Sequence, residues 1–292
     1  FVVATEVTPP MGADSQKLRR DIELVKPHAS AINFTDAASG IPRMSASACC
    51  KVAADMNAEA VYQIAARDTT RTGLQSDVIG AGQFGIKNIL CVSGDSSRVG
   101  PPPVSDMNIL DLDSVQMLWI LRRMRDEGIY LDGRKIKNPP KFFLGAATTP
   151  FAMRPDLQAI KDQKKVNAGA QFFQTNIVFE PSRLDLWLEQ LDRRGVLDKV
   201  YILIGMVPLR SFKAALHLHN KVPGVYLPAK ILERMEKAGD RAEEEGIQIT
   251  LETIDSVKHK RGVNGIHLMT LGWEAVVGRI VRESGLTPSG DR

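Results

Sequence analysis

The sequence predicts an α/β protein and, within that class, a single (β/α)8 TIM barrel over residues 1–292. Eight short apolar runs rich in β-branched residues recur along the chain, and amphipathic stretches of helical length separate them. The apolar runs show little apolar–polar alternation, which is typical of parallel strands that helices cover on the outside. A doubly wound parallel sheet is the alternative fold.

The predicted strands are short, as the strands of such barrels tend to be. They cover residues 1–5, 31–35, 60–65, 88–94, 142–147, 172–176, 200–205 and 265–269. The predicted helices cover residues 14–26, 45–57, 72–85, 113–128, 154–169, 182–195, 211–220 and 229–246. Asp113 and Ser182 are the predicted N-caps. Several helical stretches end in glycine, a common helix stop: Gly85, Gly128, Gly169, Gly195 and Gly246.

A glycine motif tests the doubly wound alternative. GAGQFG at Gly80–Gly85 has the G-x-G-x-x-G spacing of a dinucleotide-binding loop. Such a loop follows a strand and opens a helix, whereas this motif closes a predicted helix and precedes a strand. We therefore predict a helix end. Residues 95–114, with three consecutive prolines, are predicted as a long loop on the catalytic face. Residues 128–141 are predicted as an exposed hairpin or a partner contact on the opposite face.

Composition excludes several classes of protein. With 43% hydrophobic and 25% charged residues, and no apolar run near the roughly 18 residues of a membrane span, the chain is expected to be globular, without a membrane partner. The net charge of +4 forms no basic stripe with interleaved aromatics, so no nucleic-acid partner is expected. Three cysteines cannot form a disulfide framework, which indicates a cytoplasmic location. No histidine–cysteine pattern resembles a metal site.

Polar side chains follow the predicted strands at their carboxyl ends, where barrel enzymes place their active sites. Glu6, in TEVTPP, ends the first strand just before a rigid proline pair. Asp95 ends the fourth strand, and the two carboxylates would divide the roles of acid and electrostatic stabiliser. Carboxylates, amides and hydroxyls suit hydrogen bonding to a polar heterocycle. The other residues at the strand ends include Thr35, Gln63, Ser93, Gly94, Ala146, Gln174, Asn176, His267 and Thr270.

Six motifs in order along the chain resemble the methylenetetrahydrofolate reductase family, most closely its short, acetogen-type bacterial form. They are TEVTPP, FTD, YQIAARD, SGD, NAGAQFFQTN and GMVPLRSF. With the terminal HLMTLGWE segment, the resemblance covers essentially the whole chain. It implies a flavin-dependent barrel in which reduced FMN passes a hydride to the methylene carbon of 5,10-methylenetetrahydrofolate, giving 5-methyltetrahydrofolate.

The resemblance also implies roles for single residues. Glu6 matches the general acid that protonates a folate nitrogen as the five-membered ring opens to an iminium, and Asp95 matches an aspartate between flavin and pterin. Phe212 matches an aromatic residue beside the folate, with a core phenylalanine as the alternative. Lys165 matches a lysine that contacts the flavin phosphate, with a solvent-facing lysine as the alternative. Thr35, Gln63 and Ala146 match positions that line the FMN site.

Some positions depart from the family pattern. Asn176 replaces a glutamine that grips the pterin and is one methylene shorter. Ser93, before Gly94, replaces an arginine that contacts FMN, and Gln63 replaces a histidine. A tyrosine common after strand five is absent. These changes bear on flavin affinity more than on folate binding, so an FMN-free enzyme is an alternative.

Two other functions stay open at this stage. One is a tetrahydrofolate-linked methyltransferase that keeps the pterin site, and the other is a folate-binding subunit of a larger complex without redox chemistry. The resemblance further implies a small electron-relay partner subunit or an oligomer, and no regulatory domain. A folate polyglutamate tail would have three nearby cations on the catalytic face: Arg98, Arg183 and Arg210.

Overall fold

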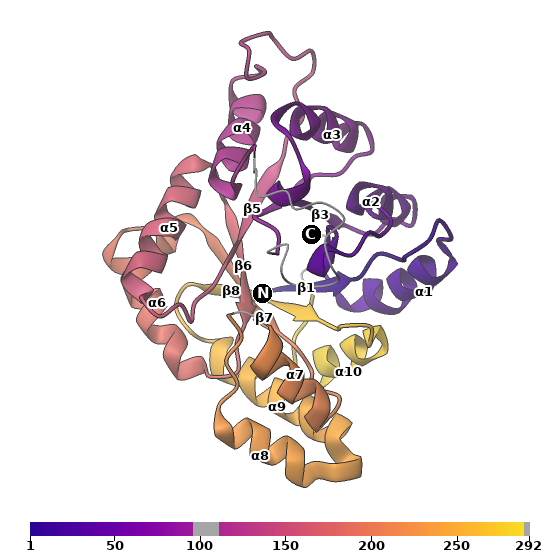
Figure 1. The fold of residues 1–292 in the computed structure, drawn as a ribbon, viewed down its shortest axis with the longest axis vertical. Helices are drawn as coiled ribbons and strands as arrows, with labels where there is room; N and C mark the ends of the chain where they lie inside the picture. Colours follow the sequence, from indigo (N-terminus) through magenta and orange to yellow (C-terminus); the bar gives the residue numbers. More distant parts are fainter. Residues whose placement is uncertain (96–110, 223, 289–292) are drawn as a thin grey trace.

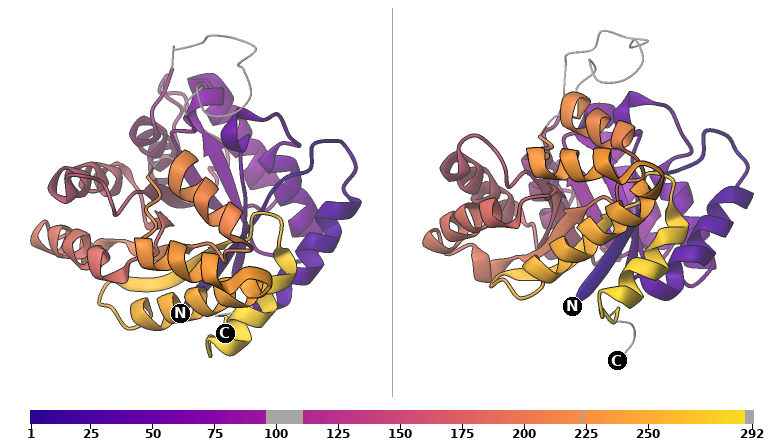
Figure 2. Two further views of the ribbon diagram at one scale, coloured as in Figure 1. Left: turned by 60° about the horizontal axis from the view of Figure 1, so that its bottom comes forward. Right: turned by 90° about the horizontal axis from the view of Figure 1, so that it is seen from below.

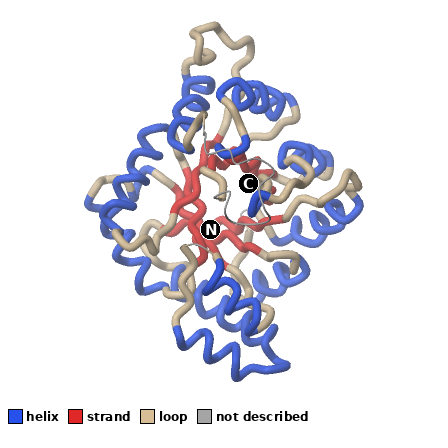
Figure 3. The backbone as a smooth tube through the Cα atoms, viewed as in Figure 1, coloured by secondary structure: helices blue, strands red, loops and turns tan. Residues whose placement is uncertain are grey.

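The structure, a computed structural model, describes residues 1–95, 111–222 and 224–288. Eight parallel strands form a closed barrel in sequence order, and β1 pairs with β8 to close it (Figure 1, Figure 3). The predicted barrel is confirmed, and each predicted strand ends within two residues of an observed one. The strands are β1 Val2–Val7, β2 Ala31–Phe34, β3 Ala60–Ala65, β4 Asn88–Val92, β5 Phe143–Thr148, β6 Phe172–Ile177, β7 Tyr201–Met206 and β8 Val263–Met269.

Helices surround the barrel and return the chain from the carboxyl end of one strand to the start of the next (Figure 1, Figure 2). Most of the long loop predicted after the fourth strand, residues 96–110, lies outside the described residues. In the described part of the chain the α-helices are α1 Gln16–Val25, α2 Ala46–Asp55, α3 Arg71–Gln83, α4 Ser114–Asp126, α5 Pro155–Ala168, α6 Pro181–Arg193, α7 Phe212–Lys221, α8 Ala229–Ala238, α9 Ala242–Val257 and α10 Val277–Glu283.

The strands bury both of their faces. Side chains alternate between the barrel interior and the helix-facing core, as strand geometry requires. The lower interior holds one apolar cluster: Ala4, Val61, Leu90, Phe172 and Leu203. The main core lies between the outer faces of the strands and the helices. The residue two places after each interior residue points inward again, one layer closer to the carboxyl ends.

The helix ends test the predicted caps. Asp113 is confirmed as an N-cap with a full capping box, since its carboxylate accepts from the Gln116 amide at 2.7 Å and its own amide donates to the Gln116 side chain. Ser182 is wrong as an N-cap, because α6 begins at Pro181 and Glu180 precedes it. Proline has the φ that a first helical residue needs. Four of the predicted glycine stops have positive φ just beyond their helices: Gly85, Gly128, Gly169 and Gly195.

Two other predicted segments are confirmed. GAGQFG closes α3, which ends at Gln83 before β4, so it is a helix end and no dinucleotide loop. Ile129 and Lys135 form an antiparallel bridge in the predicted hairpin after α4. Because α4 runs back toward the amino-terminal ends of the strands, this hairpin lies away from the catalytic face.

The chain between β7 and β8 differs from the prediction. A single helix over 229–246 with Gly246 as its stop is wrong, because α8 ends at Ala238 and α9 runs straight through Gly246. A Cβ atom at Gly246 would lie 1.7 Å from the carbonyl oxygen of Leu209. The glycine is therefore required where α9 approaches the chain after β7, not at a helix end.

Helices α7, α8 and α9 enclose a second hydrophobic cluster, distinct from the main core. The α7–α8 connection contributes Val225 and Leu227 to it, and the end of β6 and the residues after it contribute Ile177 and Phe179. The cluster therefore fastens the α7–α8 connection to the carboxyl end of β6.

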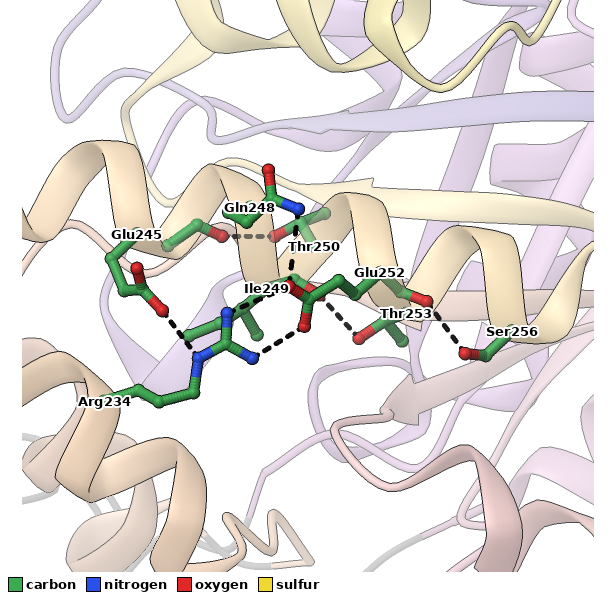
Figure 4. A network of polar contacts seen from close by, with 9 residues as sticks. Arg234, Glu245, Gln248, Ile249, Thr250, Glu252, Thr253 and Ser256 are labelled. Atoms are coloured by element: carbon green, nitrogen blue, oxygen red, sulfur yellow. Dashed lines mark hydrogen bonds and ion pairs between the residues drawn. The ribbon is translucent and has the colours of Figure 1, made fainter.

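Arg234 holds α8 against α9 (Figure 4). Its Nε donates to Glu245 at 2.6 Å, and its two terminal nitrogens donate to the carboxylate oxygens of Glu252 at 2.6 and 3.0 Å. A planar guanidinium bound by two carboxylates has little freedom to rotate. This clamp fixes α8, and with it the connection that precedes α8.

Candidate active site

A layer of polar side chains occupies the barrel interior directly above the apolar cluster. Glu6, Gln63 and Gln174 each follow a residue of that cluster by two positions, so they point inward. Asn33 pairs in register with Glu6, and His267 pairs with Ala4. Five strands thus direct carboxylate, amide and imidazole groups toward the axis, near the carboxyl ends.

Glu6 and His267 form the central contact of this layer. The imidazole Nε2 of His267 lies 3.6 Å from Glu6 Oε2, and the two side chains are 3% and 14% exposed. The loop after Glu6 is fixed at its prolines, because Met44 N–H donates to the Pro10 carbonyl at 2.8 Å and Arg43 donates to the Pro9 carbonyl at 3.1 Å. A mostly buried carboxyl held between a histidine and a rigid loop has the setting that a general acid requires.

Several buried polar atoms in this layer have no hydrogen-bond partner within the described chain. The Asn33 amide donates to Gln63 Oε1 at 3.1 Å, yet its own oxygen is unpaired. Unpaired buried polar atoms are costly, and in native proteins they point to a ligand or an ordered water. The unpaired inward-facing atoms are Asn33 Oδ1, Thr35 Oγ1, Gln174 Nε2 and His267 Nδ1. Their mix of donors and acceptors suits a polar heterocycle.

Asp95 lies at the rim, where it organises the loop after β2. Its carboxylate accepts the Ser39 amide at 2.7 Å, and its carbonyl accepts from Arg67 at 3.1 Å. Arg67 also donates to the carbonyl of Ala37 at 3.0 Å. Ala37 and Ser39 have φ of 41° and 57°, conformations that persist only where the surroundings hold them. Asp95 is therefore an exposed carboxylate in a fixed position at the tip of β4.

Gly94 and Asp36 complete the rim over β2, β3 and β4. Gly94 has φ of +84°, and a Cβ there would lie 3.0 Å from Arg67 Cβ, so a side chain at this position would crowd the arginine. Asp36 accepts the Ala65 amide at 2.9 Å, and burial raises the pKa of its carboxyl.

Lys165 lies between α5 and β5, not in the solvent-facing position that was the alternative. Its ammonium donates to the Ala147 carbonyl at 2.6 Å and lies 3.9 Å from Asp162, and burial lowers its pKa. Asp162 is fully buried and accepts hydrogen bonds from Thr148, Gln158 and Trp187. This network ties α5 and α6 to β5.

Two of the predicted cofactor-binding side chains face the helices instead of the barrel interior. Ala146 is fully buried in the helix-facing core, because the inward residue of β5 is its neighbour Ala147. Ser93 Oγ lies 3.4 Å from Ser114 Oγ at the start of α4. The Ala146 side chain therefore lies on the opposite face of β5 from the barrel interior.

Asn176 and Phe212 lie on the β6–β7 side of the mouth. Asn176 Oδ1 accepts the amide of Ile177 at 2.8 Å, and a Cβ at Gly224 would lie 2.9 Å from Asn176 Nδ2. The α7–α8 connection thus passes directly over this side chain. Phe212 opens α7 and packs against the second cluster while half-buried, which is the core role considered as its alternative.

The sequence-based site did not include Asn33. The signal for it lies in the two-residue period, because Asn33 precedes Thr35 by two positions and stands beside Glu6 in register. For this strand the prediction took the last inward residue, Thr35, and missed the inward residue directly below it.

Other features of the described residues lie away from this mouth. A cavity of about 230 Å³ lies below the polar layer, toward the amino-terminal ends of the strands. Gln174 of that layer lines its upper part, and the rest of its lining is almost wholly apolar and includes Phe143, Phe172 and Tyr201. The described chain holds no group of three or more histidine, cysteine or acidic residues placed to bind a metal. Nor does any helix in residues 1–95, 111–222 and 224–288 have the length and apolar character to cross a bilayer.

Fold and site together define a (β/α)8 barrel protein whose carboxyl-terminal mouth is lined by acidic and amide groups. The sequence model of the methylenetetrahydrofolate reductase family matches residues 1–285, and the chain belongs to this family. Methylenetetrahydrofolate reductase 1 of Schizosaccharomyces pombe is 24% identical over 229 residues, which are 74% of this chain and 35% of that protein. Methylenetetrahydrofolate reductase 2 of the same yeast is 25% identical over 226 residues, which are 70% of this chain and 32% of that protein.

The chain spans about a third of the length of these two relatives. Among solved structures, a protein from Clostridium thermocellum that binds two copies of 5-methyl-5,6,7,8-tetrahydrofolic acid matches with a TM-score of 0.67 and 13% identity, over 97% of this chain and 95% of that one. The Bacillus cereus spore cortex-lytic enzyme SleL matches with a TM-score of 0.55 and 11% identity, over 100% of this chain and 76% of the SleL chain. At such identities the likeness concerns the fold alone.

Proposed function

We propose that this barrel reduces 5,10-methylenetetrahydrofolate to 5-methyltetrahydrofolate, with Glu6 as the general acid and reduced FMN as the hydride source. The observation that carries the proposal is the mostly buried Glu6 carboxyl beside His267, within a layer of unpaired polar atoms. Family membership supports the reaction, and the Clostridium thermocellum protein supports a reduced folate as the ligand class.

In this proposal Glu6 supplies the proton of the reaction. The proton goes to a nitrogen of the five-membered ring, the carbon–nitrogen bond to the methylene carbon breaks, and the other nitrogen becomes an iminium. A hydride added to that carbon completes a two-electron reduction and leaves a methyl group. His267 Nε2 faces the Glu6 carboxyl, and the rigid proline loop holds the backbone that follows Glu6. Together these two contacts keep the carboxyl oriented.

Asp95 and the buried amides position and stabilise the substrate. Asp95 presents a carboxylate at the tip of β4, where negative charge stabilises a cationic iminium. Gln174 and Asn33 have one unpaired polar atom each, and these are the groups that would read the edge of a pterin. Asn176 would contact it from the rim, directly or through a water molecule.

The residues present fit an FMN group. Thr35 and Gln63 offer hydrogen-bonding atoms on the inner faces of β2 and β3, and Gly94 keeps the tip of β4 free of a side chain. Lys165 retains 15% exposure, and of its three N–H donors one is used by Ala147 in the described chain. It would hold the phosphate. When bound and reduced, FMN supplies the hydride.

A spectrum of the purified protein tests the proposal. We expect a flavin band, native or after reconstitution with FMN, that reductant bleaches and 5,10-methylenetetrahydrofolate restores, with 5-methyltetrahydrofolate as the product. Binding of 5-methyltetrahydrofolate without any reduction would overturn the redox assignment in favour of the methyltransferase or the folate-binding subunit. If a flavin-free protein forms the product with another reductant, only the assignment of FMN as the hydride source would be overturned.

We also propose that the barrel works with a second subunit, either a small electron-relay partner or another copy. Three large apolar side chains on the neighbouring helices α5 and α6 and the loop before α5 are exposed: Met153, Leu157 and Leu186. Light scattering should report more than one chain for the wild type and a shift toward the monomer for Leu157→Glu. A monomeric wild type that binds no partner would contradict this.

A further inference from the structure

The rim of the catalytic mouth carries a cation flanked by two aromatic rings. The Arg183 guanidinium carbon lies 4.7 Å from the ring centroid of Tyr226 and 5.5 Å from that of Phe151. Three separate segments supply these residues: the first turn of α6, the α7–α8 connection and the loop after β5. All three segments meet at the carboxyl ends of β5 and β6.

Packing fixes the position of this cluster. Val225 and Leu227, on either side of Tyr226, are buried in the second hydrophobic cluster, so the tyrosine ring is directed outward. Arg234 holds the following helix, α8, against α9 (Figure 4). Gly224 passes beside the Asn176 amide and Thr149. The cluster therefore stands next to the mouth on a well-supported loop.

The two described arginines considered for a folate tail, Arg183 and Arg210, differ in how their charge is compensated. Arg210 donates two hydrogen bonds to Glu243, at 3.1 and 3.2 Å, and stacks on Trp273. Among the described residues, the carboxylate that pairs with Arg183 is that of Glu180 at 3.9 Å, which is beyond hydrogen-bonding distance. Arg183 is 41% exposed and keeps its planar fork of donors available. It suits a carboxylate ligand, whereas Arg210 already has one.

We propose that Arg183, Tyr226 and Phe151 form the subsite for the benzoylglutamate portion of a reduced folate. An aromatic ring that leaves the mouth near Asn176 meets the rings of Tyr226 and Phe151, and the glutamate carboxylates beyond it meet Arg183. The inference rests on the proposed function, because it takes the pterin to lie in the interior polar layer. It selects Arg183 over Arg210 as the cation for the tail.

Binding of two probes tests this subsite. The probes are 5-methyltetrahydrofolate and 5-methyltetrahydropteroate, which lacks the glutamate, each titrated calorimetrically into the wild type, Arg183→Gln and the matched control Arg210→Gln. We expect Arg183→Gln to weaken the folate roughly tenfold and the pteroate less than about twofold, because the lost contact is charge-assisted and belongs to the glutamate. Arg210→Gln should change both by less than about twofold.

The tyrosine gives a second, independent comparison. Tyr226→Phe keeps the ring beside Arg183 and should bind both probes as the wild type does, whereas Tyr226→Leu should weaken both. Equal loss for both probes in Arg183→Gln, or no loss, would overturn the subsite while the wild type still binds folate. A wild type that binds neither probe would overturn the proposed function together with the subsite.

Discussion

At the level of single residues, the contact between Glu6 and His267 matters most for the proposed chemistry. Both side chains are mostly buried, and the imidazole nitrogen that faces Glu6 is 3.6 Å from its carboxylate. Such contacts often lengthen without substrate and tighten when it binds. His267 is therefore a positioning residue for the acid.

Removal of His267 should lower kcat and leave KM nearly unchanged, a separation that a purely structural role would not produce. His267→Leu should lower kcat by roughly tenfold or more with less than about a twofold change in KM, because the Glu6 carboxyl loses the side chain that orients it. His267→Gln retains an N–H group and should keep most of the activity. An unchanged kcat in His267→Leu would remove the histidine from this role.

The three cysteines provide a residue-level test of burial. Burial raises the pKa of Cys49 and of Cys91 to about 12, and Cys50, next to Cys49 in α2, is buried as well. A thiol with such a pKa is almost wholly protonated at pH 8 and reacts slowly. Titration with a disulfide reagent at pH 8 should show no rapid thiol in the folded protein and three after denaturation. One rapid thiol in the native state would contradict the burial of these three side chains in α2 and β4.

Among the secondary-structure elements, α9 shows most clearly what the sequence could not reveal. Glycine commonly ends helices, so a stop at Gly246 was a reasonable expectation. What places it inside a helix is the Leu209 carbonyl, a contact between segments far apart in sequence. The local sequence pattern predicts a helix or strand well where its ends depend on residues nearby in the sequence. The prediction fails where a contact with a distant segment determines where the helix ends.

Substitution of two helical glycines tests this explanation. Gly246→Ala should lower the free energy of unfolding by about 3 kcal/mol, because its Cβ would overlap the backbone of Leu209. The matched change Gly80→Ala, inside α3 with nothing within 4 Å of the new Cβ, should raise it by about 0.5–1 kcal/mol. Urea unfolding measures both. Similar effects of the two substitutions would refute the close-approach account.

The strands show how much of the candidate site can be predicted from the sequence. All eight strands were predictable, because short apolar runs between amphipathic helices leave few alternatives. The direction of each side chain was less secure. Ala146 was expected at the site and faces the helices, while Asn33 was not expected and faces the axis. A shift of one residue reverses the face, and only the observed register settles it.

For the whole molecule, the presence of two hydrophobic clusters predicts uneven local stability. The barrel strands lie within the main core, whereas α7 and α8 rest on the smaller second cluster and on the Arg234 clamp. Elements with less buried apolar contact open more readily. The helical block that follows β7, formed by α7 and α8, should therefore loosen before the barrel does (Figure 1).

Hydrogen exchange measures this difference directly. Amides of α8 should exchange well before those of β1, β6 and β8, and 5-methyltetrahydrofolate should slow exchange in residues 224–228 and in the first turn of α6. Helix α3, on the other side of the barrel, serves as the control that the ligand leaves unchanged. Exchange of α8 in step with the barrel strands would show one cooperative unit and contradict the two-cluster description.

The central claim is that Glu6 donates the proton in folate reduction, and a single-turnover experiment with Glu6→Gln tests it most directly. The protein, loaded with reduced FMN, is mixed with 5,10-methylenetetrahydrofolate, and 5-methyltetrahydrofolate is measured by chromatography. We predict that Glu6→Gln still accepts electrons into the flavin and still binds 5-methyltetrahydrofolate, yet forms product 10²–10⁴-fold more slowly than the wild type. Product formation at the wild-type rate would contradict the claim.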